Sequence, residues 1–328
     1  MTDSLLTAVV CTRNRAARLE LCLRRLLRQS APRGAYEILV VDNGSTDGTA
    51  DVCRRFEPDG VRRIEEPVVG LSPARNAGWQ AARGAYVGYL DDDGQAEETW
   101  IAAAAEVFST VRPEPAWTGG AIDLDWEVPP PSWLDRPLWE CLGHLDYGSP
   151  PRWLEPDERL GGGNSFFPRA WLERLGGFDT RLGRQGDALL SGEETQLQRR
   201  IEAAGGRLYY RPDIRMRHHV PAERATPSYF YRRYYWGGIT DAVIRRTLRA
   251  PAAGAVGSPA ATPLPSAATR GDPRPAAALV RLLRNAAAAA GFARRDARVR
   301  GRIYLAYVAG RLAGVRRRDG ESAGEGRP

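Results

Sequence analysis

The spacing of apolar residues changes regularly along the first hundred residues of the chain. Short apolar runs of strand length occupy residues 5–11, 36–41, 61–65 and 85–90. Segments with apolar residues at helical spacing lie between these runs, at residues 16–29, 46–56 and 73–83. Because strands and helices alternate, the sequence predicts an α/β fold with a Rossmann-like, mostly parallel sheet that is flanked by helices.

This alternation ends after one more predicted helix at residues 98–108. Residues 112–160 are rich in Pro and Trp and hold no long periodic segment, which is typical of a lid or a binding loop. Beyond them the pattern predicts two helices and two short strands, at residues 169–175, 193–203, 207–210 and 214–218.

The C-terminal part of the chain has a different composition. Residues 251–275 are rich in Ala, Pro, Gly and Ser and are predicted to be a linker, followed by Arg-rich helices at 276–290 and 296–314. Residues 241–328 hold 17 Arg and six acidic residues, so the net charge of +7 is concentrated here. This pattern is compatible with peripheral contact to an anionic membrane, or with a solvated face that packs on its own domain. No nucleic-acid-binding motif accompanies the charge.

Composition also restricts the compartment and the chemistry. All 47 basic residues are Arg, so no mechanism can use a catalytic or phosphate-binding lysine. The four cysteines are scattered without metal-binding spacing, which favours reduced thiols and a cytoplasmic location. We expect no secretory signal at the N-terminus, and no apolar run reaches the ~20 residues that span a bilayer.

Three consecutive aspartates, Asp91, Asp92 and Asp93, follow the apolar run at 85–90 and precede Gly94. A buried carboxylate is costly unless it is paired or binds a metal, so this cluster is expected where the strand leaves the sheet. Ligands of open α/β sheets bind at this end of the strands. The cluster therefore predicts a divalent cation and, through it, a phosphate-containing ligand.

Six segments in a fixed order resemble the family 2 glycosyltransferases with a GT-A fold. They are VVCTRNR, EILVVDNGSTDGT, GLSPARNAGWQAARG, YVGYLDDDG, GGGNSFFPR with a later GGFD, and GEETQL. The resemblance covers residues 5–220. It implies a nucleotide-sugar-binding half at 1–110 and an acceptor-binding and catalytic half at 111–248, before a linker at 249–275 and a basic helical extension at 276–328.

The resemblance implies a metal site that holds Mn²⁺ or Mg²⁺. Asp93 is the expected metal ligand. One of the two histidines at the end of the strand at 214–218, His218 or His219, is expected to supply a further ligand. We favour His218 over His219, because alternation along that strand places it with Ile214 and Met216. Asp91 is expected to bond the ribose or the donor sugar, and Asp92 is grouped with the donor-binding residues, with a structural role as the alternative.

Further donor-binding residues follow from the same resemblance. The loop of Thr12, Arg13 and Asn14 is expected beneath the base and ribose of the nucleotide. Asp42 is expected to bind the base or the ribose, and an Asx turn that stabilises its loop is the alternative.

Two later donor-binding positions complete this set. Arg75 is placed beside the diphosphate, where a guanidinium can make charge-assisted bonds to phosphate, with a surface salt bridge as the alternative. Asn164 lies in the glycine-dense segment 161–164, which the resemblance places near the donor sugar and the acceptor. A purely structural turn is the alternative for that segment.

Glu193 and Glu194 begin a predicted helix, where the helix dipole favours negative charge whatever the function. The resembled family usually has Glu-Asp here, with the second acid as the general base. This chain has Glu194 at that position, and we predict it to be the base. Glu193 is predicted to contact the acceptor or to raise the pKa of the base.

We therefore predict an inverting transferase that moves a sugar from a nucleotide sugar, most simply a UDP-sugar, to an acceptor nucleophile. The acceptor is open among a secondary metabolite, a polysaccharide and a lipid carrier. The tryptophans of the irregular region can supply aromatic platforms for it, and some of them must belong to the core; they are Trp117, Trp126, Trp133, Trp139 and Trp153. Two alternatives are a sugar nucleotidylyltransferase and a non-catalytic protein that binds sugar nucleotides.

Overall fold

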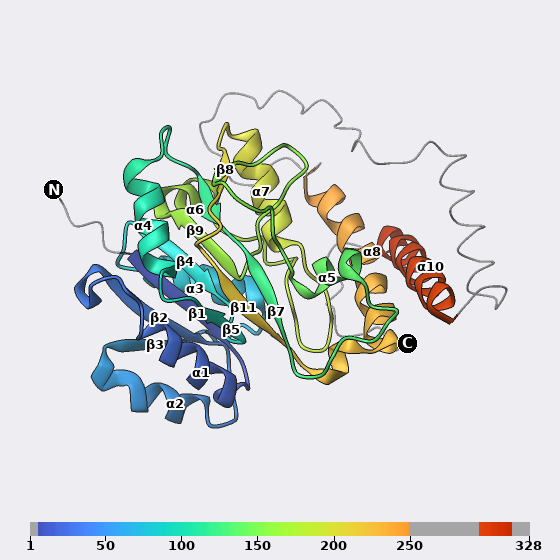
Figure 1. Cartoon of the computed structure of the whole chain (residues 1–328), viewed down its shortest axis with the longest axis horizontal. Helices are drawn as coiled ribbons and strands as arrows, with labels where there is room; N and C mark the ends of the chain where they lie inside the picture. Colours follow the sequence, from blue (N-terminus) through green and yellow to red (C-terminus); the bar gives the residue numbers. More distant parts are fainter. Residues whose placement is uncertain (1–5, 249–294, 317–328) are drawn as a thin grey trace. The chain divides into compact units, whose positions relative to one another are not determined.

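The computed structural model describes residues 6–248 and 295–316 (Figure 1). They form two compact units, each described by itself. The first comprises Met1–Pro129, Arg136–Asp187 and Glu193–Ala222; the second comprises Pro130–Asp135, Ala188–Gly192 and Glu223–Pro328. The predicted linker at 251–275 and the predicted helix at 276–290 lie outside the described residues.

The first unit is built on an eight-stranded mixed sheet with the order β3-β2-β1-β4-β9-β6-β10-β8. The four strands at one side are parallel to one another and are β1 (Leu6–Thr12), β2 (Tyr36–Asp42), β3 (Val61–Glu65) and β4 (Tyr86–Leu90). The other four include antiparallel pairs and are β6 (Trp117–Gly119), β8 (Arg152–Trp153), β9 (Asn164–Pro168) and β10 (Leu208–Tyr210). The predicted mostly parallel α/β fold is confirmed.

A smaller three-stranded sheet has the order β5-β11-β7. Its strands are β5 (Gly94–Ala96), β7 (Ile122–Trp126) and β11 (Met216–Val220). In the central strand, His218 pairs with Gly94 of β5 on one side and with Leu124 of β7 on the other. This register brings β11 beside the turn that follows β4.

Helices cover both faces of the large sheet (Figure 1). One core contains Val10 and Phe166 together with residues of α1 (Ala16–Leu26), α2 (Thr49–Phe56) and α4 (Trp100–Thr110). The other contains Val9 and Phe167 with residues of α3 (Leu71–Ala81), α6 (Arg169–Leu175) and α7 (Glu193–Ala203). Neighbouring strand residues enter opposite cores because side chains alternate across a strand, and burial on both faces explains the nearly continuous apolar runs.

The region predicted to be irregular, residues 112–160, contains more regular structure than its sequence indicates. It includes β6, β7, β8 and the short helix α5 (Arg136–Trp139). These elements have two to five residues, too few to produce a recognisable period. Trp117 lies in the sheet core with none of its surface exposed, as predicted for part of this Trp set.

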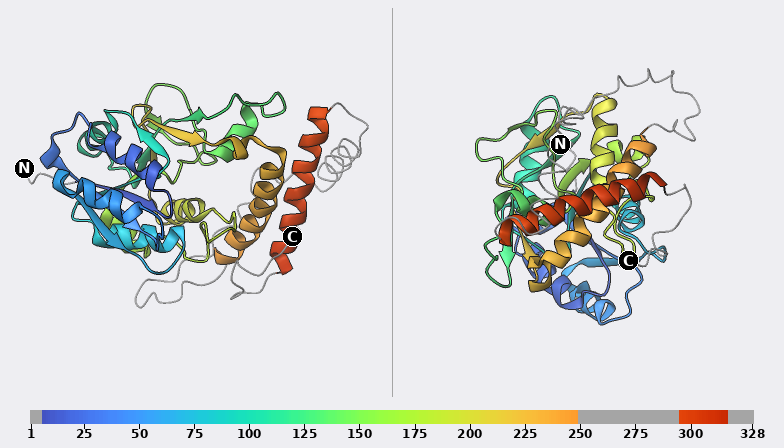
Figure 2. Two further views of the ribbon diagram at one scale, coloured as in Figure 1. Left: turned by 90° about the horizontal axis from the view of Figure 1, so that it is seen from below. Right: turned by 90° about the vertical axis from the view of Figure 1, so that its right-hand side faces the viewer.

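In the described part of the second unit, two long helices pack against each other. They are α8 (Pro227–Thr247) and α10 (Arg295–Arg316), which lie side by side in Figure 2. Gly310 and Gly314 of α10 pack against α8, and a methyl group on Gly314 would lie 2.9 Å from the Cα of Ile239. Glycine therefore allows the two backbones to approach closely. In the described ranges, no helix is long and apolar enough to cross a membrane.

Candidate active site

The acidic cluster lies at the carboxyl end of β4, where its three side chains take different positions. Ligand atoms of Asp91, Asp93 and His218 all lie within 4.8 Å of one another. The Asp91 side chain is 39 % exposed, whereas that of Asp93 is 8 % exposed. Two carboxylates and an imidazole supply the oxygen and nitrogen donors that suit a divalent cation such as Mn²⁺ or Mg²⁺.

The orientation of His218 fits a metal ligand. Its Nδ1 lies 2.7 Å from the carbonyl oxygen of Leu142, so Nδ1 carries the hydrogen and donates it. Nε2 then presents a lone pair and lies 3.2 Å from Oδ1 of Asp93. Two lone-pair donors at this distance repel unless a cation or a proton lies between them, so the pair fits the predicted ion. Holding one ring nitrogen on a carbonyl is a common way to orient a metal-binding histidine.

His219 takes a different position, although its backbone also meets the cluster. Its N–H donates to the carbonyl oxygen of Asp93 over 3.1 Å. Its side chain is buried, with Nδ1 3.7 Å from Oδ2 of Asp125. Of the two histidines, only His218 joins the described group of potential metal ligands, in line with the preference drawn from strand alternation.

Asp92 points away from this triad and is buried. Its Oδ2 accepts a 2.8 Å hydrogen bond from the hydroxyl of Thr12, and its Oδ1 accepts one from Nη1 of Arg15 over 2.9 Å. The same Nη1 donates to Oδ2 of Asp93 over 2.9 Å. Burial raises the pKa of Asp92 to about 6, although the Arg15 charge opposes this shift.

Arg15 is a site residue that the sequence prediction missed. It follows β1, and β1 and β4 are neighbours in the sheet, so the residues after each strand meet at one edge. The strand order supplies this contact, and a single sequence does not reveal it. The only sequence signal was the position of Arg15 one residue after the predicted donor-binding loop.

Arg75 lies on α3 and connects two parts of the site. Its Nη1 donates to Oε1 of Glu193 over 2.7 Å, and its Nη2 lies 3.5 Å from Oδ1 of Asp91. The guanidinium also lies over the rings of Tyr89 and Phe178, at 5.8 and 5.4 Å from their centroids. The Arg75 side chain is 4 % exposed, so its pair with Glu193 is buried and its contact with the more exposed Asp91 is partly buried.

The carboxylate pair begins α7. Glu193 is buried, and burial together with the neighbouring Glu194 charge raises the pKa of Glu193 to about 8. Oε2 of Glu193 is buried without a hydrogen-bond partner among the described residues. Glu194 is partly exposed, and its Oε1 accepts a long hydrogen bond of 3.4 Å from Thr195. Glu194 is thus the more accessible acid of the pair, as a general base must be.

The glycine segment before β9 passes directly over these groups. A methyl group on Gly162 would lie 3.0 Å from Nη1 of Arg75 and 3.1 Å from Cβ of Glu194. One on Gly163 would overlap the carboxylate of Asp91. Only glycine permits the backbone to approach this closely. The segment therefore joins the acid cluster, Arg75 and Glu194 into one site within the first unit.

Asn164 is placed beneath this segment and not on its surface. The side chain is fully buried, and its Nδ2 donates to the carbonyl oxygens of Ala121 and Ile214 over 3.1 and 2.8 Å. Its Oδ1 accepts a 2.7 Å bond from the indole of Trp100. Both amide hydrogens are used, so a hydrogen bond donated to a ligand would require breaking one of these contacts. The contacts give Asn164 a role in fixing the glycine segment.

Asp42 ends β2, and its side chain stabilises the following loop, which is the structural role given as the alternative to donor binding. Its Oδ1 accepts from the backbone N–H of Ser45 over 3.0 Å, and its Oδ2 accepts 2.7 and 3.1 Å bonds from Arg63. Burial alone would raise the pKa of Asp42, but the bonds from Ser45 and Arg63 outweigh it and lower the pKa. Asp42 therefore carries its charge whether or not it binds a nucleotide.

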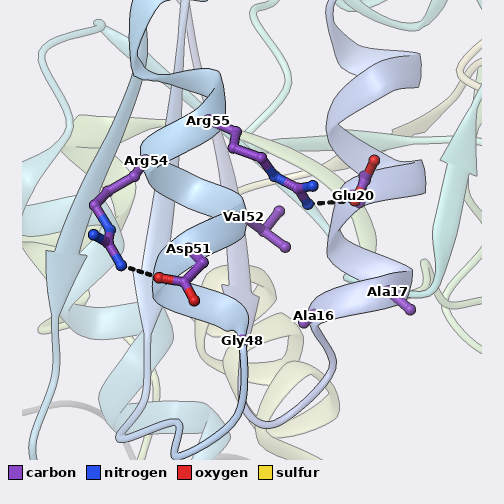
Figure 3. A pocket seen from close by; sticks show the side chains of 8 residues that line it. All are labelled: Ala16, Ala17, Glu20, Gly48, Asp51, Val52, Arg54 and Arg55. Atoms are coloured by element: carbon purple, nitrogen blue, oxygen red, sulfur yellow. Dashed lines mark hydrogen bonds and ion pairs between the residues drawn. The ribbon is translucent and has the colours of Figure 1, made fainter.

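The other loop residues lie near the same edge of the sheet. Asn14 adopts a left-handed backbone with φ of 55°. Its Oδ1 accepts from the N–H of Thr46 over 2.7 Å, which links the loops after β1 and β2. Arg13 is exposed. A surface pocket between α1 and α2 (Figure 3) contains none of the predicted site residues and is lined by Ala16, Ala17, Glu20, Gly48, Asp51, Val52, Arg54 and Arg55.

Comparisons with known proteins show which family the chain is similar to. Residues 7–114 match the model of glycosyl transferase family 2. The chain is 28 % identical over 211 residues to the glucosyl-dolichyl phosphate glucuronosyltransferase of Haloferax volcanii, a match that covers 63 % of this chain and 67 % of that protein. It is 33 % identical over 114 residues to glycosyltransferase AglE of the same organism, covering 33 % of this chain and 38 % of AglE.

Solved structures give the same fold. The mannosyltransferase PcManGT of Pyrobaculum calidifontis, in complex with GDP-Man and Mn²⁺, matches with a TM-score of 0.58 and 22 % identity, over 95 % of this chain and 87 % of that one. GalNAc-T7 with UDP, GalNAc and Mn²⁺ matches with a TM-score of 0.51 and 19 % identity, over 75 % and 51 %. The fold is therefore of the GT-A type. Over the residues matched by the family model, the chain is similar to glycosyl transferase family 2.

Proposed function

We propose that this protein transfers a sugar from a nucleoside diphosphate sugar, in the first instance a UDP-sugar, to an acceptor nucleophile with inversion at the anomeric carbon. One observation carries the proposal. The triad of Asp91, Asp93 and His218 and the accessible carboxylate of Glu194 belong to a single site, which Arg75 and the glycine segment hold together. The triad suits the diphosphate of such a donor, and Glu194 suits the activation of a nucleophile that attacks its anomeric carbon.

The donor would occupy the edge where β1, β2 and β4 end. Asp93 and His218 would hold Mn²⁺ or Mg²⁺, which when bound offsets negative charge on the diphosphate. Asp91 is exposed enough to bond the ribose or the donor sugar. PcManGT holds GDP-Man with Mn²⁺, and a structure of TarS of S. aureus holds UDP, which supports a nucleotide-sugar donor without fixing its base.

The remaining donor residues are proposed to act around the nucleotide. Thr12 ends β1 and is followed by Arg13 and Asn14, and Asp42 ends the neighbouring strand, so all four lie at the ends of adjacent strands. Arg75 would act on the donor through Asp91, because its guanidinium is already paired with two carboxylates.

Glu194 is proposed to be the general base. The acceptor oxygen attacks the anomeric carbon, the bond from that carbon to the phosphate oxygen breaks, and the nucleoside diphosphate leaves with the bonding electrons. The acceptor proton passes to Glu194. Glu193 holds its own proton more tightly because it is buried beside Glu194. Arg75 fixes Glu193 in place, and charge placement of this kind supplies much of the rate of such reactions.

The acceptor is proposed to carry a sugar that is linked to a lipid. The relative from H. volcanii is named for glucosyl-dolichyl phosphate, which supports this choice. Trp126 and Trp139 form a partly exposed edge-to-face pair with ring centroids 5.5 Å apart, and they suit the apolar face of a sugar ring. Trp126 lies two residues beyond Leu124, the β7 partner of His218, so this pair begins two positions along the strand from the proposed metal ligand.

We also propose that α10 contacts an anionic membrane where such an acceptor resides. One face of α10 packs on α8, so this part of the basic tail also packs on its own domain, as the alternative interpretation of the charge expected. Leu312 and Val315, however, are 61 % and 72 % exposed on α10. Exposed apolar side chains on an Arg-rich helix are typical of helices that lie on a membrane surface.

Substitution of Glu194 by Gln tests the proposed reaction. This change removes the proton acceptor but keeps the shape of the side chain. Transfer should fall by about a hundredfold or more, the scale of general base catalysis. Donor affinity, measured by calorimetry with Mn²⁺, should stay within about threefold of wild type, since such a change is under 1 kcal/mol. Transfer at near wild-type rates would refute the assignment.

A further inference from the structure

Arg15 binds two members of the acidic cluster with one nitrogen. Nη1 lies 2.9 Å from Oδ1 of Asp92 and 2.9 Å from Oδ2 of Asp93. The charge of Asp92 is the largest influence on the guanidinium and raises its pKa far above its usual value. Asp93 is thus contacted from two sides, with Arg15 at Oδ2 and His218 at Oδ1.

The acidic cluster carries more negative charge than the arginines beside it offset, which favours a further cation at the cluster. Asp91, Asp92 and Asp93 are consecutive, and two arginines of the described part of the chain, Arg15 and Arg75, form ion pairs with them. Arg75 is shared with the buried Glu193, whereas the ion pairs of Arg15 with described residues are those to Asp92 and Asp93. The Arg15 side chain is 41 % exposed, so it can turn toward solvent without opening the core.

We propose that Arg15 is a positioning residue that serves as the counter-cation of the acidic cluster and thereby weakens the binding of a divalent metal on its own. The inference rests on the metal site of the proposed function. An ion held by Asp93 shares that carboxylate with the Arg15 guanidinium, and two cations on one carboxylate repel. A donor diphosphate carries the negative charge that favours both cations together, so metal and donor should bind with mutual support.

Removing the charge should therefore strengthen metal binding in the absence of donor. We expect the full-length Arg15→Gln protein to bind Mn²⁺ about tenfold more tightly than wild type, which is the order of one Coulomb interaction at a partly exposed site. The metal-free Arg15→Gln protein should also melt at a lower temperature, because Asp92 and Asp93 lose their counter-charge. Added Mn²⁺ should restore more of the melting temperature than it does in wild type.

Mn²⁺ affinity is measured by electron paramagnetic resonance of the free ion, without donor, beside thermal unfolding. Arg18→Gln is the matched control, since it makes the same charge change on the first turn of α1 and should leave the affinity unchanged. Asp93→Asn should abolish the binding. If Asp93→Asn binds Mn²⁺ as wild type does, the metal site itself is wrong. If Asp93→Asn loses binding but Arg15→Gln binds equally or less tightly, only the role of Arg15 is overturned.

A second variant keeps the test decisive if Arg15→Gln does not fold. Arg15→Lys retains the positive charge but has a single nitrogen at the end of a flexible stem. If charge determines the metal affinity, this variant should bind Mn²⁺ within about threefold of wild type. A tenfold gain in Mn²⁺ affinity in Arg15→Lys would overturn the proposal, because the charge would then not be the cause.

Discussion

The pair of Arg75 and Glu193 allows a quantitative test of how the site is held together. Both side chains are 4 % exposed, and Nη1 and Oε1 lie 2.7 Å apart. Replacing Arg75 by Met leaves a buried carboxylate without its partner, which costs about 3–5 kcal/mol in unfolding free energy. Glu193 can reduce this cost by taking up a proton, because burial has already raised its pKa to about 8.

The cost of Arg75→Met should therefore depend on pH. The cost should be larger at pH 8.5 than at pH 6 by roughly 0.7–0.8 kcal/mol, because pH 8.5 lies about half a unit above the pKa of Glu193 and one pKa unit corresponds to about 1.4 kcal/mol. The double variant Arg75→Met with Glu193→Gln should be less destabilised than the sum of the single variants by about 1–3 kcal/mol. Urea unfolding at the two pH values measures these differences. Additive effects that do not change with pH would show that the two groups do not form a buried ion pair.

Three further predictions concern other features of the molecule. Gly163→Ala places a methyl group 2.6 Å from Oδ1 of Asp91 and should weaken Mn²⁺ binding at least tenfold, whereas Gly34→Ala, with open space around it, should not. Because the raised pKa of Glu193 means that the folded state holds a proton which the unfolded state releases, stability should fall as pH rises from about 4.5 to 8, and Glu193→Gln should flatten that dependence in thermal unfolding. Leu312→Glu should reduce flotation with anionic vesicles severalfold, while Leu21→Glu, a second exposed leucine, should leave it unchanged; equal flotation of both variants would contradict the membrane contact.

The sequence was most informative where structure follows from local pattern. The runs that became β1 to β4 are buried on both faces, so their apolar character stands out against the helices between them. The acid cluster could be placed at a strand end because carboxylates cannot continue a buried strand. These two signals are local, and they were enough to indicate the α/β fold and the position of the proposed metal site.

The features that were missed depend on contacts between distant segments. Arg15 reaches Asp92 and Asp93 only because β1 and β4 are neighbours in the sheet. Arg75 pairs with Glu193 across 118 positions of the chain. The helix α8 escaped prediction because its residues are apolar or aromatic on several faces and include two adjacent glycines, which hides a helical period.

The reaction proposed for this site breaks the bond between a sugar and a nucleoside diphosphate. The most direct measurement follows nucleoside diphosphate release from a panel of UDP- and GDP-sugars with Mn²⁺, using the full chain beside Asp93→Asn and Glu194→Gln. We predict release by the wild type with at least one donor, because a slow transfer to water remains when the acceptor is omitted, and loss of release in Asp93→Asn. Binding of donors without any release, even when lipid-linked sugar acceptors are supplied, would contradict the proposed reaction and indicate a protein that only binds sugar nucleotides.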